Sequence, residues 1–406
     1  MIRSFTIENF CSFRHPAEVS FVVGKSAPEN TTFRDSLIPE ERLSTLVGIF
    51  GPNASGKTNL LRGLSFIAWF LLHSYEAAPD DPIPVDGFRP LGPEEPTRAE
   101  LEYEAEGTLF RYKAELTATS VLSETLSRRG ESGRFSAVLQ RQSTGGEEKP
   151  SITIHEILDI PAGVLLNTLR PNASIVSTAL QTGNELLRRW VKGLNGASNV
   201  HRFGRASHLA ESHLLRSAIQ IFHRDRQLFE QMHDLVQRGD LGIKQIDITE
   251  ETVIDQDKGE MRKELVATVT HTAGDLPDFA LPMLLESSGT KRLFILLSWL
   301  LPALRDGRPA IIDELESDLH PHMLPWVLRL FTTPVLNTKQ AQLIFTCHSV
   351  EMLNELDKTQ IVLVGKDPGD NVSVATRLDE IKGVRRDDNL FAKYNAGLYG
   401  AVPEPL

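Results

Sequence analysis

The residues best suited to chemistry lie in a glycine-bounded loop, Gly51-Pro-Asn-Ala-Ser-Gly56-Lys57-Thr58. It fits G-x-x-x-x-G-K-[ST], in which glycines let successive backbone N–H groups curl toward phosphate oxygens without Cβ clashes. In such a loop Lys57 neutralises phosphate charge and the Thr58 hydroxyl is a ligand for Mg²⁺. The pattern predicts a nucleotide phosphate site whose contacting residues are Asn53, Ala54, Ser55, Gly56, Lys57, Thr58 and Asn59.

The segments on either side of this loop have the patterns of a strand and a helix. Residues 46–50 form a short apolar run typical of a buried strand, and a helical pattern continues from Asn59 to about Ser74. The helix would add the positive end of its dipole to the same anion site. A plain glycine turn between strand and helix is the alternative, but these flanks favour the phosphate loop.

Two adjacent carboxylates, Asp313 and Glu314, follow the apolar run 309–312. In P-loop enzymes such a strand lies beside the phosphate loop, where the Asp holds Mg²⁺ and the adjacent Glu orients the attacking water. Alone, this pattern is most often an ordinary strand end. Paired with the phosphate loop, it predicts a metal role for Asp313, with Thr58, and a catalytic role for Glu314.

Two further polar positions lie at the ends of apolar segments. His348 follows the apolar strand 342–347, at the carboxyl end where ligands bind in parallel α/β sheets. A neutral imidazole there could hydrogen-bond a γ-phosphate. Ser287, Ser288 and Gly289 precede the apolar helix 293–304 and could form a second anion site. A structural histidine and a simple helix cap by Ser287 or Ser288 are the alternatives.

Composition limits the classes of protein that remain. The 406 residues include 43 basic and 54 acidic side chains, a net charge of −11, which argues against a surface built uniformly for polyanions. The two cysteines, Cys11 and Cys347, lie far apart, which fits a reducing cytoplasm without a disulfide framework. The first ten residues alternate like a strand and not like a signal peptide, and the longest apolar runs are too short to cross a bilayer. We expect a cytoplasmic protein.

Periodicity predicts the remaining elements. Strands are expected at 2–7 and 17–23, and the period-two pattern of 99–126 indicates antiparallel strands. The segment from about 165 to 239 has a helical period, clearest at 185–194 and 214–236. Two more strands are expected, at 243–249 and 264–270.

The order of the motifs resembles the ABC-type ATPase heads of the SMC, RecF and OLD families. Ser287, Ser288 and Gly289 match the signature loop of these heads. Asp313 and Glu314 match the Walker B pair, and His348 matches the switch histidine. Residues 315–321 resemble the loop that crosses the dimer interface, and residues 7–13 resemble the opening strand motif. Within the group the chain is most similar to RloA-like AAA-family ATPases of phage-defence systems, whose relatives include PtuA and AriA, while residues 75–280 match only loosely.

The resemblance implies an α/β fold, an ABC-type P-loop ATPase head with a mixed sheet, an antiparallel β subdomain and an inserted helical subdomain. Its expected parts are an N-terminal lobe at 1–160, the helical insertion at 161–240 and a C-terminal lobe at 241–406. It implies ATP and Mg²⁺ as cofactors, and a head-to-head dimer in which Ser287–Gly289 of one subunit close the ATP site of the other. Hydrolysis is expected to be slow, because Cys11 replaces the usual basic residue of the opening motif and no clear Mg²⁺-sensing Gln is found.

Two functions compete at this stage. The first is an ATP-dependent switch that controls a partner effector, most plausibly a nuclease, in antiphage defence. OLD relatives carry a Toprim nuclease domain after the head, but 58 residues follow His348, so we expect no nuclease domain in this chain. The second is a RecF-like DNA-repair clamp, suggested by a basic bias between 185 and 226 with Arg188, Arg189 and Lys192 as contacts. A solvated helical face explains that bias equally well.

Overall fold

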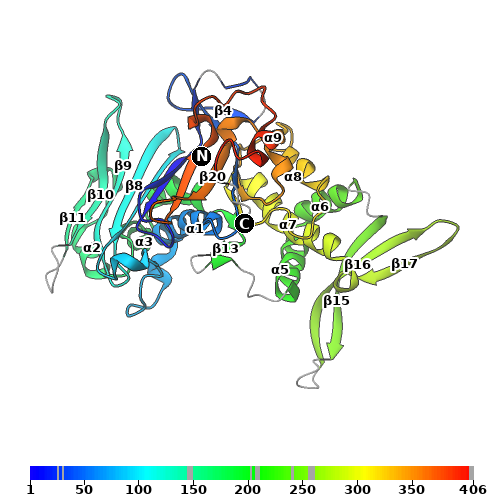
Figure 1. Ribbon diagram of the computed structural model, residues 1–406. Coiled ribbons are helices and arrows are strands. Elements are labelled where there is room, and N and C mark those ends of the chain that lie inside the picture. The colour runs from blue at the N-terminus through cyan, green and yellow to red at the C-terminus, as the bar shows by residue number, and fades with distance from the viewer. Residues whose placement is uncertain are drawn as a thin grey trace.

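The computed structural model describes residues 1–24, 27–29, 32–143, 150–201, 204–205, 211–238, 242–254 and 261–401. Two large sheets lie beside each other, helices pack between and around them, and a smaller sheet projects from the opposite end of the molecule (Figure 1). No helix among these residues is both long and apolar enough to cross a membrane.

The central sheet has six strands in the order β12-β18-β19-β6-β20-β21. The first five are parallel and β21 runs antiparallel to β20, so the sheet is mixed, as expected for this fold class. Because β18, β19 and β6 are neighbours, their carboxyl ends meet at one edge, where α/β sheets bind ligands. The bounds are β6 (Leu46–Phe50), β12 (Ala197–Ser198), β18 (Ala310–Ile312), β19 (Leu343–Thr346), β20 (Ile361–Lys366) and β21 (Ser373–Arg377).

The second large sheet is antiparallel throughout, with the order β11-β10-β9-β8-β7-β1-β2. Burial alternates along its strands, which is the pattern of a sheet with one face on a core. The strands expected from the period of two are therefore confirmed. Their bounds are β1 (Ile2–Glu8), β2 (Ala17–Ser20), β7 (Thr97–Ala105), β8 (Thr108–Leu116), β9 (Val121–Arg129), β10 (Phe135–Gln142) and β11 (Ser151–Ile154).

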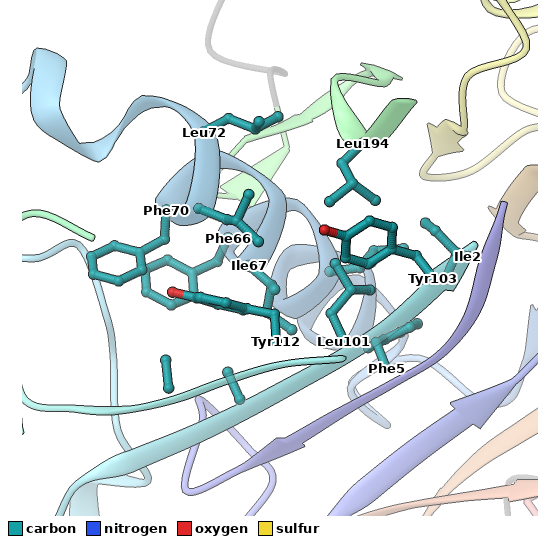
Figure 2. Packing of buried hydrophobic residues seen from close by; sticks show 14 of the residues in the cluster. Ile2, Phe5, Phe66, Ile67, Phe70, Leu72, Leu101, Tyr103, Tyr112 and Leu194 are labelled. Carbon is teal, nitrogen blue, oxygen red and sulfur yellow. The ribbon is translucent and has the colours of Figure 1, made fainter. Parts of the chain in front are cut away.

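Helix α1 (Lys57–His73) lies between the two large sheets and contacts strands of both. Figure 2 shows Phe66, Ile67 and Phe70 of this helix packed against Tyr112 and its neighbours on the antiparallel sheet. A helix that is apolar on most of its surface is stable only when it is buried on most sides. This packing holds the phosphate loop, at the start of α1, against the edge of the central sheet.

The remaining helices divide between two hydrophobic cores. Helices α3 and α4 pack in the core that contains α1, whereas α5 and α6 pack on α7 in the second core. The helical insertion expected at 161–240 therefore has no single core of its own, and its boundaries stay a prediction. The bounds are α2 (Ala162–Thr168), α3 (Ile175–Leu180), α4 (Glu185–Val191), α5 (Glu211–Arg224), α6 (Arg226–Arg238), α7 (Ser288–Asp306), α8 (Met323–Thr332) and α9 (Leu390–Asn395).

The helical pattern expected across 214–236 is two helices, because the chain breaks at Asp225. Its carboxylate accepts the N–H of Leu228 at 3.1 Å and also binds Arg305 of α7. An Asp that caps the following helix competes with helix continuation. The break lets α5 and α6 lie on two sides of α7 (Figure 1).

A three-stranded antiparallel sheet, the projecting sheet, precedes α7 (Figure 1). It consists of β15 (Ile243–Ile254), β16 (Met261–Ala273) and β17 (Leu276–Pro282), followed by the short 3-10 helix η6 (Met283–Leu285). The two expected strands are confirmed but longer, and β17 was not expected. Strand β17 has no alternation of buried and exposed residues, because nearly every residue is exposed. Its two prolines are typical of an edge strand. Two small sheets complete the fold: a three-stranded sheet of β3 (Val22–Gly24), β5 (Glu41–Ser44) and β4 (Phe33–Asp35), and the pair β13 (Val200–His201) and β14 (Gly204–Arg205).

Candidate nucleotide site

The phosphate loop, residues 51–58, joins β6 to α1 and needs glycine at both ends. Gly51 has φ 147° and Gly56 has φ 114°, conformations that L side chains rarely adopt. A Cβ on Gly51 would lie 2.0 Å from the Val364 carbonyl oxygen, and a Cβ on Gly56 would lie 2.5 Å from Ser373 Oγ. No side chain caps the start of α1, so its first N–H groups are left for an anion.

Two side chains of the loop fit phosphate oxygens. Lys57 Nζ donates to the carbonyl oxygens of Gly51 and Pro52 at 2.8 and 2.9 Å, so the ammonium is held against the loop. Burial lowers the pKa of Lys57, and the nearby carboxylates oppose that shift, Asp313 most strongly, followed by Glu316 and Glu314. Ser55 Oγ is buried without a hydrogen-bond partner among the described residues. A buried cation and an unsatisfied hydroxyl are suited to a charged acceptor such as phosphate.

Asp313 meets Thr58 across the chain, as the sequence predicted for the metal site. Thr58 Oγ1 donates to the two carboxylate oxygens of Asp313 at 3.0 and 3.2 Å, although 255 positions separate the residues. Thr346 Oγ1 donates to Asp313 Oδ1 at 2.6 Å. The described residues hold no cluster of three or more His, Cys, Asp or Glu that could bind a metal. A hydroxyl and one carboxylate fit Mg²⁺, which usually keeps waters and takes further ligands from substrate phosphates.

Glu314 and His348 lie at the same edge of the central sheet. The backbone N–H of Glu314 donates to Thr346 Oγ1 at 2.7 Å, and its Oε2 accepts from Ser317 Oγ at 3.0 Å. Glu314 has φ 50°, a left-handed conformation that is uncommon for a residue with a side chain. His348 lies two residues after the end of β19 and is exposed, and its backbone N–H donates to Glu316 Oε1 at 2.6 Å. The structure thus brings the predicted catalytic residues to one edge; their roles stay predictions.

Asn199 was missed by the sequence analysis although it holds Asp313 in place. It directly follows the two-residue strand β12, and its side chain is 3% exposed. Asn199 Nδ2 donates to the Asp313 carbonyl at 2.9 Å, and its Oδ1 accepts the Asp313 N–H at 2.7 Å. Neither the short strand nor its pairing with β18 has a sequence signal, so the residue could be found only from the structure.

The opening motif supports the phosphate loop from the other side. Ser12 Oγ accepts from Asn59 Nδ2 at 3.0 Å and from Ser373 Oγ at 2.8 Å. Ser373 also contacts the Ser55 carbonyl at 2.5 Å. These serines were not expected, because their positions, at 12 and 373, become neighbours only through the pairing of distant segments.

Cys11, which stands where a basic residue is usual, has a basic neighbour. Arg62 of α1 lies 3.3 Å from the Cys11 sulfur and forms an ion pair with Asp86 at 2.7 Å. Burial raises the pKa of the Cys11 thiol to about 11, against the opposing effect of Arg62. The basic side chain beside Cys11 therefore comes from α1, as Arg62. Arg14, the basic residue nearest to Cys11 in the sequence, lies instead 3.9 Å from Asp370.

The signature loop, Ser287–Ser288–Gly289, begins α7. Ser287 is the N-cap: its Oγ accepts the Thr290 N–H at 3.1 Å. Ser287 and Ser288 are exposed, and a Cβ on Gly289 would lie 3.2 Å from the Asp318 carbonyl oxygen. Among the described residues no hydrogen bond joins this loop to residues 51–59 of the same chain. Within the described part of one molecule the two anion-binding loops are therefore not hydrogen-bonded to each other.

The proposed nucleic-acid contacts lie on the surface of α4 and just after it. Arg188 forms an ion pair with Glu185, and Arg189 lies 3.9 Å from Glu106. Lys192 is exposed. Other members of the basic bias are also paired, including Arg216 with Glu264 and Arg226 with Glu230, while Arg202 lies outside the described residues. Much of this positive charge is thus balanced locally.

Residues 46–354, more than half of the chain, match the family model described as "AAA domain, putative AbiEii toxin, Type IV TA system". The chain belongs to this family of AAA domains. Its phosphate loop, Asp313–Glu314 pair and signature loop all lie inside the matched range. A comparison with curated proteins gives no match.

Heads of SMC proteins are among the solved structures similar to this chain. The SMC head domain from Thermotoga maritima is 16% identical in sequence and has a TM-score of 0.43. The match covers 93% of this chain and 98% of the Thermotoga chain. An SMC head bound to the C-terminal winged-helix domain of ScpA is 13% identical, with the same two coverages and a TM-score of 0.49. The more specific relation to RloA-like proteins, PtuA and AriA stays a prediction.

Proposed function

We propose that this protein is an ATP-binding and hydrolysing switch that dimerises around ATP and controls a partner effector in antiphage defence. The observation that carries the proposal is the contrast between its two loops. Inside one chain Lys57 is bonded to the Gly51 carbonyl and Thr58 to Asp313, whereas Ser287 and Ser288 face solvent at the start of α7. Buried phosphate charge needs donors on every side, so a second copy of the chain supplies the missing side.

The chain's own groups have distinct roles in this proposal. Lys57 and the first N–H groups of α1 bind the phosphates, and Ser55 Oγ adds a donor. Thr58 and Asp313 hold Mg²⁺, which supplies positive charge to the phosphate oxygens. Glu314, oriented by Ser317, accepts the proton of the attacking water. His348, exposed at the end of β19, lies where it can contact the terminal phosphate.

The partner and the defence role rest on other grounds. The family description names a toxin and a toxin–antitoxin system, a two-component arrangement, which supports a role exerted together with a second protein. We propose a nuclease as that effector, acting in trans in the cytoplasm. Co-purification of this protein with the product of a neighbouring gene, in an ATP-dependent manner, tests that part. Nuclease activity of the purified chain alone would contradict it.

The RecF-like clamp remains the alternative function, with DNA contacts through Arg188, Arg189 and Lys192. The pairing of Arg188 and Arg189 with acidic neighbours weakens it. A salt-sensitive DNA affinity that disappears when these three residues become Ala would favour the clamp over the switch.

Subunit mixing tests the two-copy site directly. Lys57→Ala removes the phosphate cation of its own site, and Ser287→Arg blocks the loop that closes the partner's site, so each variant alone is expected to lack ATPase activity. Mixed dimers contain one site with both parts intact, and mixing should restore part of the wild-type rate. Ser287→Arg alone should bind ATP with near wild-type affinity.

A matched control uses residues of the same site. Lys57→Ala mixed with Glu314→Gln should restore no activity, because Lys57 and Glu314 act on the nucleotide bound by their own chain and both sites stay defective. Rescue in this control, or no rescue in the first mixture, contradicts the shared site. Loss of ATP binding by Ser287→Arg contradicts it as well.

A further inference from the structure

A side-chain contact joins the projecting sheet to the residue before the signature loop. His271, on β16, places Nε2 at 2.7 Å from Glu286 Oε1. Both side chains are largely buried, with 16% and 6% of their surfaces exposed. Glu286 directly precedes Ser287, the N-cap of α7. The contact therefore lies one residue from a group that the proposed function assigns to the partner's ATP site.

The projecting sheet fixes His271 on two sides. His271 pairs in register with Phe279 of β17, and the two rings are stacked at 5.3 Å with an interplanar angle of 18°. On its other side, β16 pairs His271 with Ile243 of β15. Because Phe279 stacks on the ring and the backbone of His271 is paired on both sides, the direction of Nε2 follows the position of the sheet.

Glu286 is fixed from the other direction by η6. Its N–H donates to the Met283 carbonyl at 3.2 Å, and Met283 is buried in the second core. A carboxylate that is 94% buried is costly unless it is hydrogen-bonded, and His271 provides such a bond. Because Ser287 is in turn tied to Thr290, a displacement of Glu286 moves the first turn of α7 with it.

We propose that His271 is a positioning residue for ATP hydrolysis: through Glu286 it couples the projecting sheet to the signature loop and sets how Ser287 and Ser288 meet the nucleotide of the second copy. This inference rests on the proposed function, since it needs the signature loop to act across a dimer. His271 itself touches no nucleotide in this proposal. Its loss should therefore lower the rate of turnover and leave nucleotide affinity unchanged.

The first test replaces the donor. His271→Leu is expected to lower kcat by about tenfold, the effect typical of a residue that orients a functional group, with the Kd for ATP unchanged. His271→Gln keeps an N–H donor near the position of Nε2 and should recover most of the rate. A matched control is His233→Leu on α6, where the ring contacts Phe229 and lies outside the signature loop; it should be as active as wild type.

A second variant separates the effect of losing the contact from the effect of losing the fold. In His271→Leu/Glu286→Leu both partners become apolar, which avoids an unpaired buried carboxylate and keeps the fold, as thermal unfolding can verify. Its kcat should remain low, because the link is absent. A double variant, or a folded His271→Leu, with the wild-type kcat overturns the proposal.

The outcomes separate this inference from the function on which it rests. If Ser287→Arg abolishes turnover while His271→Leu and the double variant match wild type, the positioning role is wrong and the shared site stands. If Ser287→Arg itself has no effect, the shared site is wrong, whatever the His271 variants do.

Discussion

The starts of α1 and α7 are both helix N-termini suited to anions, but their N-cap residues and the contacts around them differ. At α1 the cap is Gly56, which has no side chain, and the surrounding polar groups are tied to distant parts of the same chain. At α7 the cap is Ser287, and its neighbour Ser288 faces solvent. The difference teaches that the polar groups of the first loop are bonded within one chain, whereas two serines of the second loop are left exposed, which is where the proposed function places a second copy.

The two regions also differ in the contacts that hold them in place. Asp313 is held by Thr58 of α1, by Thr346 of β19 and by Asn199, which follows β12. The signature loop is held by its own first turn and, through Glu286, by His271. Changes in the first region should disturb binding or chemistry within a chain, and changes in the second should disturb cooperation between chains.

The largest expected effect is on chemistry in the assembled region. Glu314→Gln removes the proposed proton acceptor while keeping the side-chain shape, so the rate of phosphate release should fall by roughly 10²–10⁴-fold. ATP affinity, measured with a fluorescent nucleotide, should stay near wild type. Glu351→Gln, at an exposed carboxylate in the 3-10 helix Val350–Glu355, is the matched control and should keep full activity. Normal turnover in Glu314→Gln would show that the role given to Glu314 is wrong.

The next effect is on binding. Gly56→Ala forces a Cβ toward Ser373 Oγ and Ser12 Oγ at a φ of 114°, a strain of about 1–3 kcal/mol. ATP affinity should fall, because relieving the strain displaces the first turn of α1. Gly193→Ala meets no atom within 4 Å and serves as the control. Isothermal titration with ATP and Mg²⁺ measures both; equal affinities would mean that the loop does not bind phosphate in this conformation.

Local patterns explain what could be predicted from the sequence. The phosphate loop and the Asp313–Glu314 pair are short motifs whose residues are adjacent in the sequence. The strands of the antiparallel sheet follow a period of two. The break at Asp225 could not be predicted, since the apolar period continues through it; the structure shows that Asp225 caps the second helix and also binds Arg305 of α7. Asn199 and Ser373 gain their roles only when distant strands pair, which leaves no local signal.

Asn199→Ala tests a residue that the sequence did not indicate. The change leaves the N–H and carbonyl of Asp313 without their side-chain partner, so the carboxylate should lose its fixed direction. The Mg²⁺ concentration needed for half-maximal ATPase activity should rise about tenfold, as for other supports of a metal ligand. Asn195→Ala, before β12, is the control. An unchanged Mg²⁺ requirement would restrict Asn199 to a structural role.

The smallest expected effect on activity lies away from both loops, in the antiparallel sheet. Glu124 is buried there and accepts hydrogen bonds from Tyr112 Oη, Ser174 Oγ and the Ile175 N–H at the start of α3. Glu124→Gln loses one acceptor, since a carboxamide has a single oxygen, and should lower the free energy of unfolding by about 1–3 kcal/mol. ATPase activity at 25 °C should be unchanged, because the site is held by other contacts.

The stability of Glu124→Gln should also depend on pH differently from that of wild type. Burial raises the pKa of Glu124 above its ordinary value of 4.5, against the opposing hydrogen bonds and Arg141, so the folded state binds this proton more tightly than the unfolded state does. Its stabilising contribution is therefore present below pH 4.5 and is lost as the pH rises through the raised pKa. Urea unfolding between pH 4.5 and 8 should show a flatter pH profile for Glu124→Gln than for wild type, whereas the exposed Glu131→Gln should not change it. Equal profiles would mean that the pKa of Glu124 is not raised in the folded protein, its three donors then balancing or outweighing its burial.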